Sequence, residues 1–206
     1  MNNVVYASDA LLSDIVGGGE LNDYELCLEL QNRGLNITKL RSSQLSVGHI
    51  STNSFYIISN FVMLNNRVIE KIQNTCKYMI YEHDHKYLKN RNPAIFKDYK
   101  APDNIIINEE FYKKAKAVFC QSSFHESIIK KNLNLHNVYN VSGNLWSIDS
   151  LMTMRELSKK QKKDLLKPDM VDIIRIMTYM MPDLVTLEAV MAVVGVNNGV
   201  FCSKMD

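Results

Sequence analysis

Short runs of apolar residues alternate with segments of helical periodicity along the first 150 residues of this chain. The runs are four to six residues long, and helical segments separate most of them. The expected strands are residues 4–8, 35–40, 55–58, 78–81, 117–120 and 138–141, and the expected helices are residues 20–33, 68–72, 108–116 and 123–133. Strands that alternate with helices in this way are typical of an α/β domain with a mostly parallel sheet.

Local signals predict where these elements end and which sides they bury. Gly34 follows the first helix as a C′ stop. Ser123 and Glu126 form a capping-box pattern that opens the helix at residues 123–133. This interpretation is favoured over a catalytic pair of Ser122 or Ser123 with His125. Residues 90–104 are polar, contain two prolines and predict a loop or lid. The residues expected on one face of the first helix are Leu21, Tyr24, Cys27 and Leu28.

The pattern changes near Asp149, so we expect one domain over residues 1–150 and a different segment over residues 151–206. Six basic residues crowd residues 155–167, which indicates a basic linker or an exposed helix. Residues 170–202 are rich in methionine and other apolar residues. Two helices there would either pack back on the sheet or form the interface of a homodimer or of a complex with a partner chain.

Composition excludes several classes of protein. The chain carries 24 basic and 22 acidic residues, a formal charge of +2, which argues against a general nucleic-acid-binding protein. Its four cysteines form no C-x-x-C pair, so neither a zinc knuckle nor a disulfide framework is expected. There is no signal-peptide pattern, and the longest uncharged apolar stretch, residues 189–203, is too short to span a bilayer. These features predict a cytoplasmic protein without a transmembrane segment, with peripheral attachment to a membrane left open.

Three clusters follow expected strands, at the sheet edge where parallel α/β domains bind ligands. They are Gly17–Gly19, Glu82–His85 and Gln121–Ser123. Glycines ahead of a helix let backbone N–H groups approach a phosphate, and the helix N-terminus adds a partial positive charge. The glycine run completes neither G-x-G-x-x-G nor a P-loop, so a flexible turn is the alternative.

The cluster Glu82-His83-Asp84-His85 places four ionisable side chains in four positions. In an extended segment, His83 and His85 would point one way and Glu82 and Asp84 the other. A carboxylate beside an imidazole can tune a general base or orient a hydrogen bond to a sugar hydroxyl. A metal site would need a third ligand that the sequence does not show, and a solvated strand end is a further alternative.

Four segments share their order and spacing with a known family. Gly-Gly-Gly-Glu at 17–20 opens a long helix, and residues 81–85 end a strand. Residues 115–125 run from small residues through an apolar strand to two serines, and residues 138–149 carry Gly143-Asn144. Together these segments resemble the N-terminal, acceptor-side domain of GT-B glycosyltransferases of the family 4-like group. The resemblance covers residues 1–150 and implies a Rossmann-like domain of three layers.

The resemblance also implies a function. It suggests a transferase that moves a hexose from a nucleotide sugar to a glycan or another hydroxyl acceptor. The nucleotide sugar is a substrate, and neither a metal nor another cofactor is implied. Gly17, Gly18 and Gly19 would reach the donor diphosphate, and His83 and Asp84 would be the catalytic residues. The residues implied to contact the acceptor or the sugar are Glu82, His85 and Ser122.

The chain departs from the family after Asp149. Only 57 residues follow, whereas a second Rossmann-like domain needs more than about 100, and the Glu-x7-Glu motif of the donor domain is missing. A glycosyltransferase, or the N-terminal half of one, is the first hypothesis. A non-catalytic glycan- or nucleotide-binding module that works with a partner chain is the second. A dehydrogenase-like enzyme is the third, and the incomplete glycine fingerprint disfavours it.

Overall fold

A computed structural model describes residues 3–160 of the chain, with side chains through Leu157. Their six strands form one parallel sheet in the order β2-β1-β3-β4-β5-β6, which confirms the predicted α/β, Rossmann-like fold. The strands are β1 (Asn3–Ser8), β2 (Asn36–Arg41), β3 (Phe55–Ile58), β4 (Lys77–Tyr81), β5 (Val118–Cys120) and β6 (Val138–Asn140). The α-helices are α1 (Gly18–Asn32), α2 (Asn66–Thr75), α3 (Glu109–Lys114), α4 (Ser123–Leu133) and α5 (Ile148–Lys160). Short 3-10 helices are η1 (Ser42–Gln44), η2 (Val47–His49), η3 (Pro93–Ile95), η4 (Lys97–Tyr99) and η5 (Asp103–Ile105).

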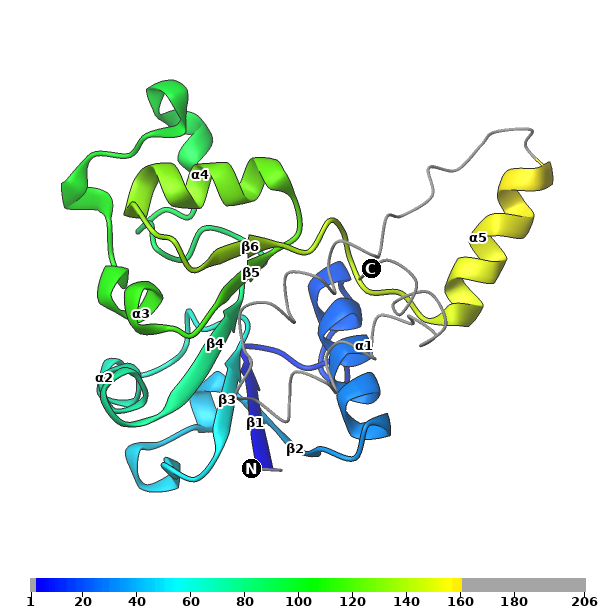
Figure 1. Cartoon of the computed structure of the whole chain (residues 1–206), viewed down its shortest axis with the longest axis horizontal. Helices are drawn as coiled ribbons and strands as arrows, with labels where there is room; N and C mark the ends of the chain where they lie inside the picture. The colour runs from blue at the N-terminus through cyan, green and yellow to red at the C-terminus, as the bar shows by residue number, and fades with distance from the viewer. Residues whose placement is uncertain (1–2, 161–206) are drawn as a thin grey trace, which may run out of the picture.

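Helices cover the sheet from both sides (Figure 1). Helix α1 lies on one face, and α2, α3 and α4 lie on the other. The chain steps from β1 to β2 in one direction along the sheet and from β3 to β6 in the other, so right-handed crossovers place these helices on opposite faces. The direction changes between β1 and β3. The carboxyl ends of the strands at this switch point are where open parallel sheets bind ligands.

Strand β3 shows why the strand signals are so apolar. Tyr56 and Ile58 pack in the core on the side of α2 to α4, whereas Phe55 and Ile57 pack in the core under α1. All four side chains are buried. A strand that is covered on both faces has no solvent side, so it is continuously apolar rather than alternating. Burying each such large side chain stabilises the fold by about 1.5–3 kcal/mol.

Helix α1 buries a different face from the one predicted. Cys27 is buried as expected, but Leu21, Tyr24 and Leu28 are each more than a third exposed. Apolar residues occur on both sides of this helix, so periodicity alone did not identify the inner side. Two polar residues near the start of the helix belong to that inner face. The buried residues are Asn22, Asp23, Leu26, Cys27 and Leu30.

The predicted caps can be compared with the structure at the end of α1 and at the start of α4. Gly34 has φ +84°, a left-handed conformation that favours glycine, so the predicted stop after α1 is confirmed. Helix α4 begins at Ser123, but its cap is the preceding residue: the amide of His125 donates to Ser122 Oγ at 3.1 Å. The predicted cap at Ser123 is therefore wrong by one residue. The Ser122 hydroxyl is thereby engaged in the helix cap.

Residues 90–104 form the predicted loop, which carries the short helices η3, η4 and part of η5. Its second half is fastened to the end of α4. The Ala101 amide donates to Asn132 Oδ1 at 2.9 Å, and Lys100 Nζ donates to the backbone oxygens of Lys131 at 3.1 Å and Asn132 at 3.2 Å. These bonds hold the loop against α4.

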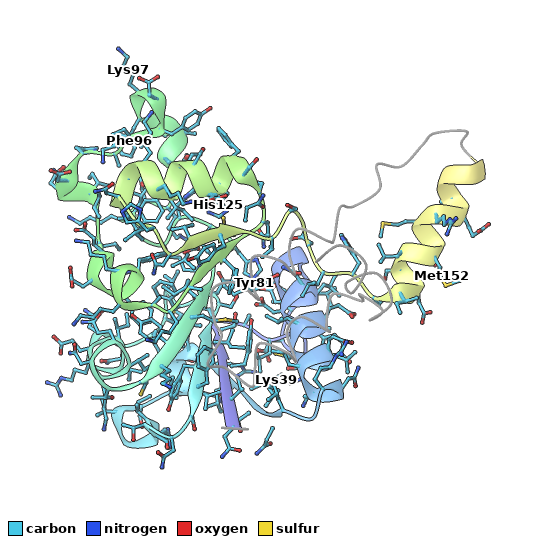
Figure 2. All side chains as sticks on the ribbon, viewed as in Figure 1. Lys39, Tyr81, Phe96, Lys97, His125 and Met152 are labelled. Carbon is cyan, nitrogen blue, oxygen red and sulfur yellow. The ribbon has the colours of Figure 1, made fainter. Side chains whose placement is uncertain are left out.

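Helix α5 stands apart from the other described elements (Figure 1). Met152 is 61% exposed, and its side chain lies away from the sheet and its helices (Figure 2). This placement agrees with an exposed helix where the basic segment begins. The interface predicted at residues 170–202 lies outside the described residues. Between residues 3 and 160, no helix is long and apolar enough to cross a membrane.

Candidate functional site

The N-terminus of α1 opens at the switch point of the sheet. Gly17 precedes the helix in an extended conformation, and the first helical hydrogen bond runs from Leu21 N to Gly17 O at 3.0 Å. The N–H groups of Gly18, Gly19 and Glu20 therefore have no acceptor within the helix, and no side chain caps this terminus. Amides of this kind, together with the helix dipole, attract anions.

The glycines leave room at this terminus. A Cβ atom added at Gly18 would meet no atom within 4 Å, so this position faces open space. A Cβ at Gly19 would lie 3.8 Å from His83 Cγ and 4.0 Å from Asn60 Nδ2. The carboxylate of Glu20 turns back over Gly17 and brings a negative charge to the same terminus. The helix start thus lies against side chains that follow β3 and β4.

His83 is the member of the predicted cluster that reaches this terminus. Its Nε2 lies 2.7 Å from Asp23 Oδ1, and its Nδ1 contacts the amide nitrogen of Gln121. The ring also packs edge-on against Tyr81, with centroids 5.1 Å apart. Its side chain is 10% exposed and that of Asp23 is 5% exposed. Residues from α1, β4 and the end of β5 therefore fix the ring together.

Asp23 is a buried carboxylate at the meeting point of three strand ends. Ser59 Oγ lies 3.0 and 2.9 Å from its two oxygens, and Ser8 Oγ donates to Oδ2 at 3.5 Å. Burial, reinforced by the charge of Asp23, raises the pKa values of Tyr6 and Tyr81 above their ordinary range. Both phenols are therefore neutral near pH 7.

Asn22 ties the start of α1 to the chain after β6. Its Nδ2 donates to Tyr81 Oη at 2.9 Å, and its Oδ1 accepts from Leu145 N at 2.6 Å. The side chain is buried, so both of its polar groups are satisfied within the protein. This amide explains why a polar residue stands beside Asp23 on the inner face of the helix.

Glu82 lies beneath the surface in an ion-pair network of its own. Lys86 Nζ donates to Oε1 at 2.5 Å, and the Tyr112 hydroxyl donates to Oε2. Lys86 also reaches Asp84 at 2.7 Å, and Arg91 meets Asp84 from the exposed side at 3.2 Å. Burial raises the pKa of Glu82; at Lys86 the two carboxylates outweigh burial and raise its pKa. The network joins the end of β4 to α3. The predicted contact of Glu82 with a sugar and the predicted catalytic role of Asp84 are not tested by this geometry and stay predictions.

His85 faces α4. Its Nδ1 lies 3.0 Å from Tyr87 Oη, and its ring centroid lies 4.4 Å from that of His125. Burial is the main cause that lowers the pKa of each of these two histidines to about 4. The pair is therefore neutral near pH 7 and packs at the start of α4, close to the capping residue Ser122. A ligand contact by His85 or Ser122 also stays a prediction.

The chain bends at residues 83 and 84, directly after β4. The predicted alternation assumed an extended segment, with His83 and His85 on one side, and it is wrong for this reason. The two rings meet different partners, one on α1 and the other on α4. Of the predicted site residues, the structure brings together Gly17, Gly18, Gly19 and His83.

One residue of this arrangement, Asp23, was missed. Asp23 stands at helical spacing with the buried Cys27 and Leu30, but the sequence alone does not show which side of this helix is buried, so no signal singled it out. Gln121, the first residue after β5, belongs to the third cluster predicted at this sheet edge, and the structure adds its contact with His83.

Within the described chain, no group of three or more His, Cys, Asp or Glu side chains could hold a metal ion. Comparisons with protein-family models, with curated proteins and with solved structures gave no match. Function is therefore inferred from the fold, the sequence motifs and the geometry at the start of α1.

Proposed function

We propose that the chain binds the diphosphate of a nucleotide sugar at the N-terminus of α1 and works as a glycosyltransferase, or as the acceptor-side half of one. The observation that carries the proposal is the uncapped start of α1, which opens at the switch point beside His83. The order of the sequence segments, which resembles that of GT-B glycosyltransferases, supports a sugar nucleotide over other phosphate ligands.

Several terms would contribute to binding and to catalysis. A helix N-terminus stabilises an anion by about 0.3–1 kcal/mol at an exposed site and by up to about 2 kcal/mol where it is partly buried. The N–H groups of Gly18, Gly19 and Glu20 add charge-assisted hydrogen bonds. Negative charge grows on the diphosphate as the sugar leaves it, so the same amides favour the transition state over the bound donor. His83 would contact the transferred sugar or the acceptor.

A non-catalytic module that works with a partner chain is the second candidate. All six described strands belong to one sheet, so residues 3–160 contain one Rossmann-like unit. The family resemblance implies a second such domain that grips the nucleotide. A partner chain would have to provide that grip if this chain supplies only the acceptor side.

Calorimetric titration of the 206-residue chain with UDP, GDP and their sugars tests the proposal. Gly18→Val is the informative variant, because its side chain would enter the open space over the helix amides without meeting protein atoms. Gly48→Val on η2 is the matched control, since its Cβ would meet only Ser46 Oγ, at 3.9 Å.

We expect saturable binding that Gly18→Val weakens at least about ten-fold, equivalent to about 1.4 kcal/mol, and that Gly48→Val leaves unchanged. Binding that is insensitive to Gly18→Val would contradict the site. An absence of binding up to millimolar nucleotide would exclude a self-sufficient transferase and would leave the partner-dependent module.

A further inference from the structure

A patch of exposed apolar and basic side chains lies where the loop of residues 90–104 packs against α4. Ile95 is 64% exposed and Phe124 is 58% exposed, although residues of these types are usually buried. Tyr99 packs edge-on against Phe124, with ring centroids 5.2 Å apart, and is itself more than a third exposed. Exposed lysines surround these side chains. The loop–α4 patch consists of Ile95, Lys97, Tyr99, Lys100, Phe124 and Lys131.

The backbone of the loop has an unusual conformation where it presents Tyr99. Asp98 has φ +53° and Tyr99 has φ +60°, a left-handed conformation that is rare for a residue as bulky as tyrosine. Residues in such conformations persist where the surrounding structure holds them. Lys131 Nζ donates to the backbone oxygen of Asp98 at 2.7 Å, and Asn132 Nδ2 donates to that of Tyr99 at 2.8 Å. Helix α4 therefore fixes the loop with the Tyr99 ring at the surface.

The lysines of the patch point to the same side as its apolar residues. Lys97 projects from the tip of the loop, away from the rest of the protein (Figure 2). Lys131 follows Phe124 by seven residues, which is two helical turns, so both lie on one face of α4. The tip and this helix face together form one projecting surface.

Acidic residues offset these lysines only in part. Asp98 is the only acidic residue between residues 95 and 101. In α4 the carboxylate of Glu126 already pairs with Lys130 at 2.5 Å. The three lysines of the patch therefore leave it with a positive charge.

This composition fits the surface of an anionic membrane. Tyrosine and other aromatic rings settle at the level of the lipid headgroups, and lysine stems lie along apolar groups while their ammonium groups reach the phosphates. Insertion of apolar side chains and attraction to anionic lipid both strengthen such binding. Interfaces between proteins are depleted in lysine, and single-stranded nucleic acid is bound in a basic groove rather than on a projecting loop.

We propose that the loop–α4 patch docks the chain on a membrane surface that contains anionic phospholipid. Ile95, Tyr99 and Phe124 enter the headgroup layer, and the lysines contact lipid phosphates. The attachment is peripheral, and it does not depend on the binding of a nucleotide sugar.

Sedimentation of the full chain with lipid vesicles tests the proposal. One set of vesicles contains phosphatidylcholine with about 30% phosphatidylglycerol, and the other contains phosphatidylcholine alone. We expect at least about ten-fold tighter binding to the anionic vesicles than to the neutral ones. This binding should weaken as the salt concentration rises, because salt screens the lysines from the headgroups.

Two variants in the patch and two matched controls locate the contact, each checked for folding by circular dichroism. Ile95→Ser and Lys97→Glu should each weaken binding to the anionic vesicles at least about five-fold. Ile148→Ser changes another isoleucine, 74% exposed, on α5. Lys77→Glu makes the same change of charge at the exposed first residue of β4, at the opposite edge of the sheet from the carboxyl ends of the strands. Both controls should leave the binding nearly unchanged.

Equal binding to the two kinds of vesicle, or binding to neither, would overturn the proposal. Binding that survives both Ile95→Ser and Lys97→Glu, or that the controls weaken equally, would also overturn it, because another part of the chain would then hold the lipid. If the chain binds no vesicles and Ile95→Ser dissociates a dimer in analytical ultracentrifugation, the patch joins two copies of the chain and the membrane attachment is wrong. None of these outcomes bears on the proposed nucleotide site.

Discussion

The buried ion pair of Glu82 and Lys86 offers a quantitative test of the structure. Lys86→Met would leave Glu82 fully buried without its cation, with the Tyr112 hydroxyl and the Asp84 amide as its remaining donors. A buried unpaired carboxylate takes up a proton rather than stay charged. The destabilisation is then set by the free energy of protonating Glu82, which depends on pH.

The magnitude follows from the ordinary pKa of a glutamate. At pH 7 the solution lies about 2.5 units above the ordinary value of 4.5, and at about 1.4 kcal/mol per unit protonation costs about 3 kcal/mol. At pH 5 the same step costs less than about 1 kcal/mol. The folded variant has a raised Glu82 pKa, so its unfolded state binds fewer protons, and the variant regains stability as the pH falls. A loss of about 3 kcal/mol corresponds to a fall of about 6–12 °C in Tm for a domain of this size.

Urea unfolding followed by circular dichroism at pH 5 and pH 7 measures this loss. Lys113→Met is the control, because Lys113 pairs with Glu109 and Glu110 on the exposed side of α3, and it should leave the free energy of unfolding nearly unchanged. Combining Lys86→Met with Glu82→Gln should recover most of the stability at pH 7, because no buried charge remains. An equal loss at both pH values would contradict this expectation, because lost packing and not the protonation of Glu82 would then cause the destabilisation.

Two further predictions concern charge around the site. Glu20→Gln should tighten the binding of a sugar nucleotide several-fold in calorimetry, because the Glu20 carboxylate competes with an anion for the start of α1; weaker binding would contradict this. The second prediction concerns His85 and His125, whose pKa values in the folded protein are about 4, below the ordinary value of 6.5. Between pH 4 and pH 6.5 the unfolded state therefore binds more protons than the folded state. The free energy of unfolding should fall as the pH drops from 6.5 toward 4. His125→Gln should reduce this loss in the free energy of unfolding by about 1 kcal/mol, after allowing for solvent screening, in unfolding curves recorded from about pH 4 to pH 7. An unchanged dependence on pH would count against the neutral histidine pair.

The sheet could be predicted because burial on two faces leaves a strong signal. Residues 55–58 were predicted as a strand and form β3 with the same limits, since every one of these side chains is buried. The cap of α4 shows the limit of local patterns. Ser122 and Ser123 are adjacent, and only the backbone geometry decides which hydroxyl accepts the His125 amide.

Part of the site could also be predicted. The rule that ligands bind at the carboxyl ends of parallel strands selected Gly17–Gly19 and His83, which the fold does bring together. Asp23 could not be found in the same way, because its role depends on which side of α1 faces the sheet, and that helix is apolar on both sides.

The burial of Glu82 lay beyond sequence reasoning for a different reason. Its partner Tyr112 stands 30 residues further along the chain, and the bend after β4 brings Lys86 against the same carboxylate. An ionisable residue at a strand end has the same sequence signal whether it contacts a ligand or anchors the strand to a neighbouring helix.

The proposed function requires that the first amides of α1 bind a phosphate group. A titration of the 15N-labelled chain with UDP-glucose, followed by two-dimensional amide NMR, tests it most directly. We predict that the amide signals of Gly18, Gly19 and Glu20 shift first and furthest, with saturation. Saturating shifts confined to other parts of the chain, or no shifts at millimolar ligand, would contradict the account.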